Sequence, residues 1–194
     1  MPLNDHVSAA IYCSLQKTMP PSPVSFEHCG NFWLYPQNLN SRCSQIPDKN
    51  KGEYTVSTEN EVSKASEKFY AALNRMLNGD SGPLADIWLH DPNVMAMHPI
   101  GGREVGWDAV RESFEKVAEL ASNGNVELRD QIIRVAGDVA CETGLERGRL
   151  KLAGRQVTIE HRVTNLYQRE GNAWKMIHHH TDTSPPMMDV ISAL

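Results

Sequence analysis

The sequence has no long hydrophobic run and no excess of positive charge. No apolar stretch approaches the roughly 18 residues that a transmembrane helix needs. The N-terminus shows no basic segment followed by an apolar one, as a secretory signal would. The 194 residues carry a formal net charge of −5, whereas nucleic acids and anionic membranes bind to basic surfaces. We therefore expect a cytoplasmic protein with neither nucleic acid nor membrane as a partner.

Cysteine is scarce, and the common cofactor motifs are missing. None of the four cysteines stands in CxxC spacing, which argues against a zinc site and against a disulfide framework. They are Cys13, Cys29, Cys43 and Cys141. The phosphate-binding patterns GxxxxGKS/T and GxGxxG do not occur, and neither does a nucleophile elbow. We expect neither a metal nor a cofactor.

The composition, 40% hydrophobic and 22% charged, is ordinary for one globular domain. Residues 1–56 differ from the rest, because they are rich in Pro, Asn and Ser and have no sustained helical or strand period. We interpret them as a poorly ordered segment whose aromatic residues could dock on the domain, or else as a stretch outside the mature protein. The domain is expected over residues 57–185, followed by a short C-terminal tail, 186–194.

Three helices are predicted in the first half of the domain. Thr58 and Glu61 have the spacing of a capping box, and an apolar stripe of helical period follows as far as Met76. A short second helix is expected after Asp80 or Ser81. A third is expected from about Trp107 to Ala121.

Strands are predicted for the second half of the domain. They are expected near 126–135, 139–152, 155–168 and 173–182, after one short early strand, 94–98, and a loop, 99–103. Helices first and then an antiparallel meander favour an α+β domain. The helical stripes would be buried against one face of the sheet.

Several motifs together resemble the SnoaL-like group of the nuclear-transport-factor-2 and ketosteroid-isomerase superfamily. They are MHPIGG, GWDAV and the closing VTNLYQREGNAWKMIHHHTD. The resemblance covers roughly residues 58–183, and the closing hairpin is also similar to the association domain of calcium/calmodulin-dependent kinase II. It implies a cone-shaped α+β barrel in which three N-terminal helices pack on a strongly curved, mainly antiparallel sheet. It also implies an internal pocket and a homodimer formed through the outer face of the sheet.

The three consecutive histidines of the last strand are the leading candidates for chemistry. Neighbouring residues on a strand point to opposite faces, so His178 and His180 share one face and His179 takes the other. A neutral imidazole is a suitable general base near neutral pH. We predict that His178 or His180 is catalytic; strand-end histidines bonded only to the backbone are the alternative.

A second strand is expected to supply an oxyanion-binding pair. Arg162 and Thr164 share a face on the strand before the hairpin turn, and they would hold the oxygen on which charge develops. If the two strands of the closing hairpin pair so that the numbers of facing residues add up to 340, Arg162 lies opposite His178. A shift of one residue instead places His161 opposite His180. Alternatively, Arg162 forms a buried ion pair with a glutamate; Glu142, Glu146 and Glu160 are the candidates.

Three further residues are expected to contact a substrate. His98 ends the early strand and would lie at the mouth of the pocket, Trp88 would form its wall or pack in the core, and Asp182 follows the histidines. A metal site is an alternative for this region, with His178 and His180 joined by His161 or Asp182. The resemblance does not call for a metal.

The sequence therefore predicts a domain that binds a small, partly apolar organic ligand. One hypothesis is a cofactor-independent isomerase, dehydratase or hydrolase. The other is a ligand-binding or oligomerisation module without turnover, because the superfamily that the chain resembles contains both kinds. The Asp base and Tyr–Asp pair of ketosteroid isomerase cannot be assigned by spacing to Tyr70, Tyr167 and Asp182.

Overall fold

The computed structural model describes residues 51–194, so nearly all of the segment predicted to be poorly ordered lies outside the described residues. Six strands form one sheet in the order β2-β1-β6-β5-β4-β3. All neighbours are antiparallel except β1 and β6, which are parallel. The strands are β1 (Met95–His98), β2 (Gly101–Val105), β3 (Ala121–Ala136), β4 (Val139–Leu152), β5 (Arg155–Glu170) and β6 (Ala173–Thr181).

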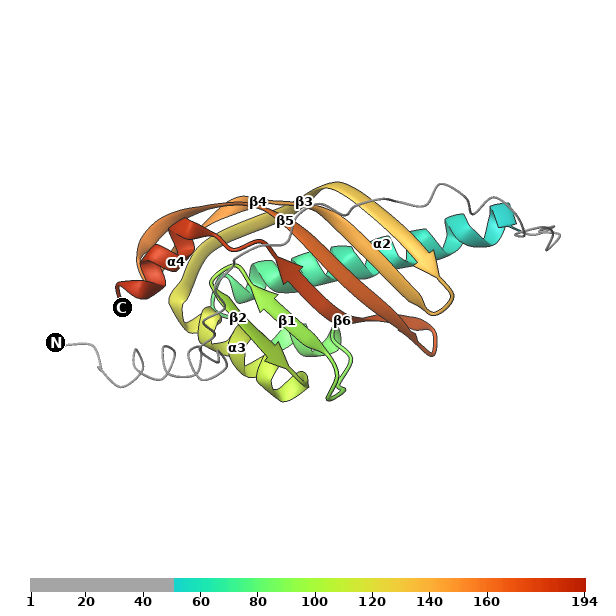
Figure 1. Cartoon of the computed structure of the whole chain (residues 1–194), viewed down its shortest axis with the longest axis horizontal. Helices are drawn as coiled ribbons and strands as arrows, with labels where there is room; N and C mark the ends of the chain where they lie inside the picture. Colours follow the sequence, from blue (N-terminus) through green and yellow to red (C-terminus); the bar gives the residue numbers. More distant parts are fainter. Residues whose placement is uncertain (1–50) are drawn as a thin grey trace, which may run out of the picture. The chain divides into compact units, whose positions relative to one another are not determined.

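Helix α2 runs across one face of the sheet (Figure 1). The helical elements of the described part are α2 (Lys51–Met76), the 3-10 helix η1 (Gly82–Asp86), α3 (Trp107–Leu120) and α4 (Pro185–Ser192). The apolar stripe predicted for the first helix is buried, including Val62, Phe69 and Met76. Gly79, just beyond α2, has a positive φ of 95°, a conformation that suits glycine after a helix end. We call the face that α2 covers the inner face. None of the helices in residues 51–194 has the length and apolar character to cross a membrane.

The α+β class is confirmed, and the tail expected over 186–194 contains most of α4. Three details of the prediction are wrong. The first helix begins at Lys51 rather than Thr58, and residues 101–103 of the loop expected over 99–103 belong to the edge strand β2. The sheet is mixed and open rather than a strongly curved, closed cone. In the described residues its two edge strands, β2 and β3, lie at opposite ends of the strand order and are not paired with each other. Gly101 and Gly102, both with φ of 90°, resemble a turn in sequence, and pairing with β1 makes them a strand.

Candidate functional site

Strand β5 shows which face of the sheet is the inner one. From Val157 to Tyr167 its odd-numbered side chains are buried and its even-numbered ones are mostly exposed. The buried set is Val157, Ile159, His161, Val163, Asn165 and Tyr167. Because residues opposite one another in an antiparallel pair share a face, the even-numbered Glu142 and Glu146 of β4 join this inner face.

A β-bulge in β6 determines which histidines point inward. Leu166 pairs with His178, but Tyr167 pairs with Met176, so Ile177 is an extra residue in β6. The alternation therefore changes phase, and both Met176 and His179 are buried on the inner face. His178 is half-buried and His180 exposed on the outer face.

His178 and His180 share a face, as predicted, and so do Arg162 and Thr164, but this face is the outer one and not the wall of an internal pocket. Neither predicted pairing occurs: Thr164 lies opposite His180, and Arg162 forms an ion pair with Asp182 at 2.8 Å between Nε and Oδ2. The Arg162 side chain is 79% exposed. The two-residue turn at Gly171 and Asn172 sets a different register from the one expected, and the bulge reverses the phase of the histidines.

Two polar rows cross the inner face, and the first spans three strands. Glu142, Asn165 and His179 are direct cross-strand neighbours on β4, β5 and β6. The Asn165 amide Nδ2 donates to Glu142 Oε2 at 2.8 Å, and its Oδ1 lies 2.8 Å from His179 Nδ1. Glu142 also accepts hydrogen bonds from Gln131 Nε2 at 2.6 Å and from the Tyr167 hydroxyl at 3.1 Å. The row thus holds the His179 ring in a fixed orientation.

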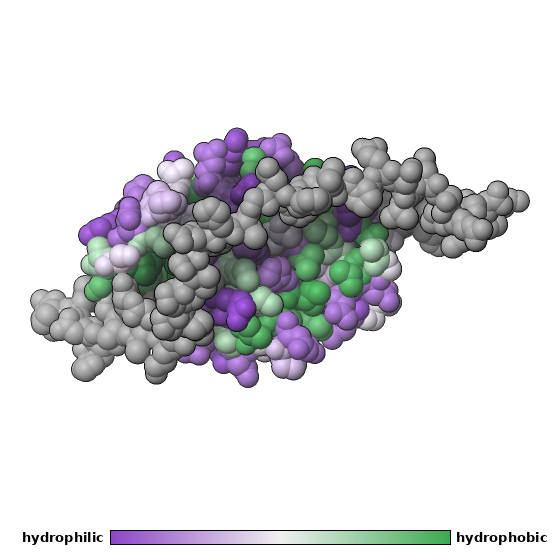
Figure 2. Space-filling view, in the orientation of Figure 1, coloured by the Kyte–Doolittle hydropathy of each residue, from purple (hydrophilic) through white to green (hydrophobic). Residues whose placement is uncertain are grey.

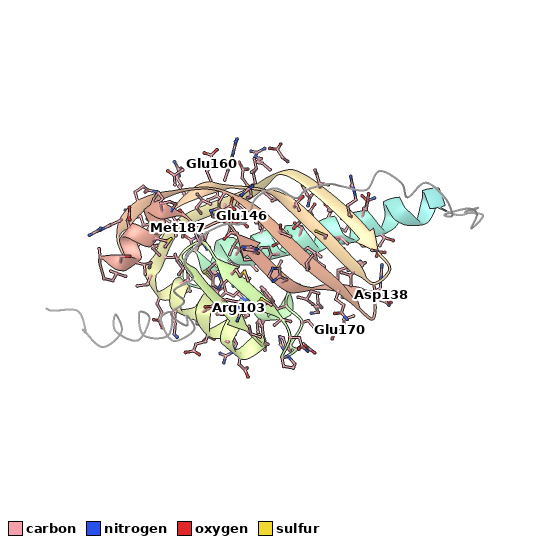
Figure 3. The ribbon with its side chains drawn as sticks, in the orientation of Figure 1. Arg103, Asp138, Glu146, Glu160, Glu170 and Met187 are labelled. Atoms are coloured by element: carbon pink, nitrogen blue, oxygen red, sulfur yellow. The ribbon has the colours of Figure 1, made fainter. Side chains whose placement is uncertain are left out.

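The second row is a carboxylate–imidazole pair. Glu146 on β4 and His161 on β5 are cross-strand neighbours, with Oε2 and Nε2 2.8 Å apart. Tyr70 of α2 donates its hydroxyl hydrogen to Glu146 Oε1 at 3.0 Å. Glu146 lies inside the fold between the sheet and α2, whereas Glu160 projects away from it (Figure 3). The side chains of Glu146 and His161 are only 5% and 4% exposed. The other ring nitrogen, His161 Nδ1, is buried and has no hydrogen-bond partner in the part that the structure describes.

His98 brings a third imidazole to the same region from β1. Its Nε2 lies 2.8 Å from Ser113 Oγ, and that hydroxyl donates to the Val110 carbonyl at 2.7 Å. A carboxylate oxygen of Glu104 lies 3.6 Å from the same Nε2. The phenyl ring of Phe114 packs against the imidazole, with 5.0 Å between ring centroids.

A small cavity lies where these groups meet. Its volume is about 60 Å³, and its polar side chains are His98, Glu146, His161 and His179. The other lining residues are apolar: Leu73, Met76, Leu77, Pro99, Ile100, Phe114, Val117, Val126, Ile159 and Met187. His98 thus borders the cavity as predicted, although its role in binding stays a prediction. Trp88 is buried in the core and does not line the cavity.

Burial controls the charge of these groups. Burial lowers the pKa of His179 to about 4 and that of His98 to about 3, so both rings are neutral at pH 7. Burial alone would raise the pKa of Glu146, but hydrogen bonds from His161 and Tyr70 outweigh it and lower that pKa. Burial and the two nearby glutamates raise the pKa of Tyr70, so its phenol stays protonated. Among the polar side chains of the cavity, Glu146 is therefore a carboxylate, and the rings of His98 and His179 are uncharged.

The residues weighed as metal ligands do not meet. His178, His180 and Asp182 lie on the outer face of the sheet, whereas His161 lies on the inner face. Within residues 51–194, no three His, Cys, Asp or Glu side chains are grouped as a metal site requires.

Most of the inner polar residues were not predicted from the sequence. His161, Glu142 and Glu146 were considered only as alternatives, and Asn165 and His179 were given no role. One signal was present: Val157, Ile159 and Val163 alternate with polar residues on β5, so the odd-numbered side chains face the core. No signal in the sequence marks the bulge at Ile177.

Comparison with known proteins shows to which family the chain belongs. A family model of the SnoaL-like domain matches residues 62–188. A Streptomyces avermitilis protein named a "putative dehydratase" of the NTF2-like family is similar in structure, with a TM-score of 0.60 and 25% identity over 68% of this chain and 99% of that one. Among curated proteins, none matches significantly.

Two further solved structures share the fold. An NTF2-like superfamily protein from Salmonella enterica has a TM-score of 0.59 and 17% identity, covering 66% of this chain and 92% of its own. A Thiobacillus denitrificans protein named a "putative calcium/calmodulin-dependent protein kinase type II association domain" has a TM-score of 0.52 and 21% identity, covering 63% of this chain and 94% of its own. The family match spans most of the chain, and the chain belongs to the SnoaL-like domain family of the NTF2-like superfamily.

Proposed function

We propose that the domain binds a small, mainly apolar organic molecule in the inner cavity and that His161 removes a proton from it. The observation that carries the proposal is the buried Nδ1 of His161, which has no partner among the described residues. Nε2 of the same ring is held by the Glu146 carboxylate. A histidine whose one nitrogen is oriented by a carboxylate and whose other nitrogen is bare is arranged as a general base.

The neighbouring groups support proton transfer at this position. When His161 Nδ1 accepts a proton, the ring becomes a cation, and the adjacent Glu146 carboxylate stabilises it by charge and hydrogen bond. The Tyr70 hydroxyl holds the other oxygen of Glu146 and so fixes the carboxylate plane. In a dehydration, the proton taken from carbon would pass from His161 to the departing hydroxyl, giving water. The likeness to the Streptomyces avermitilis protein supports this reaction class.

Cavity size limits the ligand. A volume of about 60 Å³ is well below the roughly 300–1,000 Å³ of ordinary ligand pockets. The ligand is therefore compact, or part of the wall moves when it enters. Met187 on the C-terminal helix α4 lines the cavity, and it is labelled with Glu146 in Figure 3. The backbone N–H of Ser184, which precedes α4, donates to the Pro99 carbonyl at 2.7 Å. The junction between α4 and the β1–β2 turn is the proposed entrance.

The outer face of the sheet favours a second role, homodimer formation. On the sheet face turned to the viewer, hydrophobic residues lie over β1, β6 and β5 among hydrophilic ones (Figure 2). A groove of about 500 Å³ on this side is lined partly by apolar side chains. They are Leu89, Val94, Met95, Leu166 and Ile177. Sedimentation of the domain at several concentrations measures its oligomeric state, and so tests dimer formation separately from ligand binding.

The proposed function is tested by identifying what co-purifies with the protein. Native mass spectrometry of the purified domain, followed by denaturation, should release a small neutral molecule that is also converted to a product on incubation. His161→Gln should retain binding and lose turnover, whereas the control His180→Gln, on the outer face, should keep both. Binding without turnover by the wild-type protein would leave a ligand-binding module. Equal turnover in His161→Gln would refute the catalytic assignment.

A further inference from the structure

The three histidines around the cavity each have one ring nitrogen hydrogen-bonded to another side chain of the protein. In a neutral histidine one ring nitrogen carries hydrogen and the other a lone pair, so the partner of one nitrogen fixes the role of the other. The hydrogen-bond partners of the three cavity histidines therefore define what the cavity offers to a ligand.

His98 is held with its hydrogen on Nε2. The Ser113 hydroxyl donates to the Val110 carbonyl, so it accepts from His98 Nε2 at 2.8 Å. The Glu104 carboxylate oxygen, 3.6 Å from the same nitrogen, lies beyond hydrogen-bond distance. The Ser113 contact requires a hydrogen on Nε2, which leaves the lone pair on Nδ1. Within residues 51–194, Nδ1 of His98 makes no hydrogen bond.

His179 is held with its hydrogen on Nδ1. The Asn165 amide is oriented by Glu142, because turning it over would set its carbonyl oxygen against a carboxylate oxygen 2.8 Å away. Asn165 Oδ1 then accepts from His179 Nδ1 at 2.8 Å. The lone pair therefore lies on Nε2, which has no protein partner in the described part of the chain.

The rest of the lining adds only acceptors. His161 donates from Nε2 to Glu146, and in the neutral ring its Nδ1 is an acceptor. The remaining polar side chain of the lining is the Glu146 carboxylate, which can only accept. The fourteen lining residues include neither Lys nor Arg, and no side-chain hydroxyl or amide. The cavity thus presents lone pairs in an apolar wall and no Lys or Arg to balance an anionic ligand.

We infer that the ligand is a neutral, compact, mainly apolar molecule that carries hydroxyl groups, an alcohol or enol rather than a carboxylate, a phosphate or a simple ketone. This inference rests on the proposed function and names its substrate class. Each ligand hydroxyl would donate to one of the bare imidazole nitrogens. A ligand that offered only acceptors would leave these nitrogens unpaired, and an anion would lie next to the Glu146 carboxylate with no Lys or Arg in the lining.

Three probes of nearly equal size test the inference: 2-propanol, acetone and acetate. Each is titrated into the full chain, and histidine ring and backbone amide resonances of cavity residues are followed by NMR. We expect 2-propanol to bind about tenfold more tightly than acetone, the difference that one hydrogen bond makes, and acetate not to bind. Preference for acetone or acetate at the cavity would overturn the inference and leave ligand binding intact. If every probe shifted only the resonances of outer-face residues, both this inference and the proposed function would be overturned.

A serine variant tests the reasoning from tautomers. Ser113→Ala removes the principal acceptor for His98 Nε2, so the ring becomes free to place its hydrogen on either nitrogen. The preference for 2-propanol over acetone should then shrink, and the nitrogen resonances of His98 should show a mixture of tautomers. The control is Ser192→Ala, which also removes a hydroxyl bonded to a helix carbonyl, that of Met188 at 2.8 Å. An unchanged preference and an unchanged His98 tautomer in Ser113→Ala would contradict the inference.

Discussion

Acidification from pH 7 to pH 5 should destabilise this protein, because two of its histidines are buried. His98 and His179 are buried, and their pKa values fall to about 3 and about 4 in the folded state. In the unfolded chain the same imidazoles titrate near pH 6.5. Below pH 6.5 these imidazoles bind protons in the unfolded chain but stay neutral in the folded protein. The folded state therefore loses stability as the pH falls towards the folded pKa values.

The size of the effect follows from these pKa values. Between pH 7 and pH 5 each of the two histidines should cost about 2 kcal/mol of unfolding free energy, since one pKa unit corresponds to about 1.4 kcal/mol. Glu104 acts in the opposite direction, because burial raises its pKa and its protonation then favours the folded state. The loss of stability attributable to Glu146, whose pKa is lowered, belongs to more acidic solutions, below about pH 4.5.

Urea unfolding at pH 7 and at pH 5 measures the effect in the wild-type protein and in His179→Gln. The variant should be less stable at pH 7, because Asn165 loses its partner, and its stability should change less between the two pH values by about 2 kcal/mol. His180→Gln is the matched control, a histidine one residue away on the exposed side of the same strand. Equal pH dependence in the wild type and in His179→Gln would refute the burial argument.

Three further substitutions have expected outcomes. Tyr70→Phe should cost about 1 kcal/mol of stability and raise the pKa of Glu146, checked by urea unfolding and by NMR titration of the carboxyl group. Gly148→Ala should cost more than 1 kcal/mol, because an added Cβ would lie 2.0 Å from a carbonyl oxygen of β3; Gly82→Ala, where the closest atom is 3.3 Å away on a side chain, is the control for thermal unfolding. Arg162→Ala should leave ligand affinity and the free energy of unfolding nearly unchanged, because the ion pair of Arg162 is exposed. A large loss of ligand affinity, measured by calorimetry, would indicate that the ligand binds at the outer face.

Most of the fold could be predicted because its signals are local. The stripe from Val62 to Met76 has helical period, and the turns at Gly137 and Gly154 separate strands of alternating pattern. The position of the Gly101–Val105 strand depends on pairing with β1, and the openness of the sheet depends on how distant strands pack. Neither is encoded in a short window of sequence.

The site could be predicted only to the level of residue types. Histidines in the closing hairpin were identified, but an uninterrupted alternation would place His178 and His180 on the same face as the buried Trp174 and Met176. A single extra residue, Ile177, reverses that alternation and places His179 in the core instead. The hydrogen-bond partners of His179 and His161 come from β5 and β4. Which side chains lie opposite one another therefore depends on the register of these strands.

The central claim is that the inner face of the sheet, and not the outer face, receives the ligand. Histidine-selective NMR of the full chain tests it most directly, using the molecule that co-purifies with the protein. The ring resonances of His98, His161 and His179 should shift on binding, and those of His180 should stay in place. Shifts confined to His178 and His180, with the three buried rings unaffected, would contradict the account.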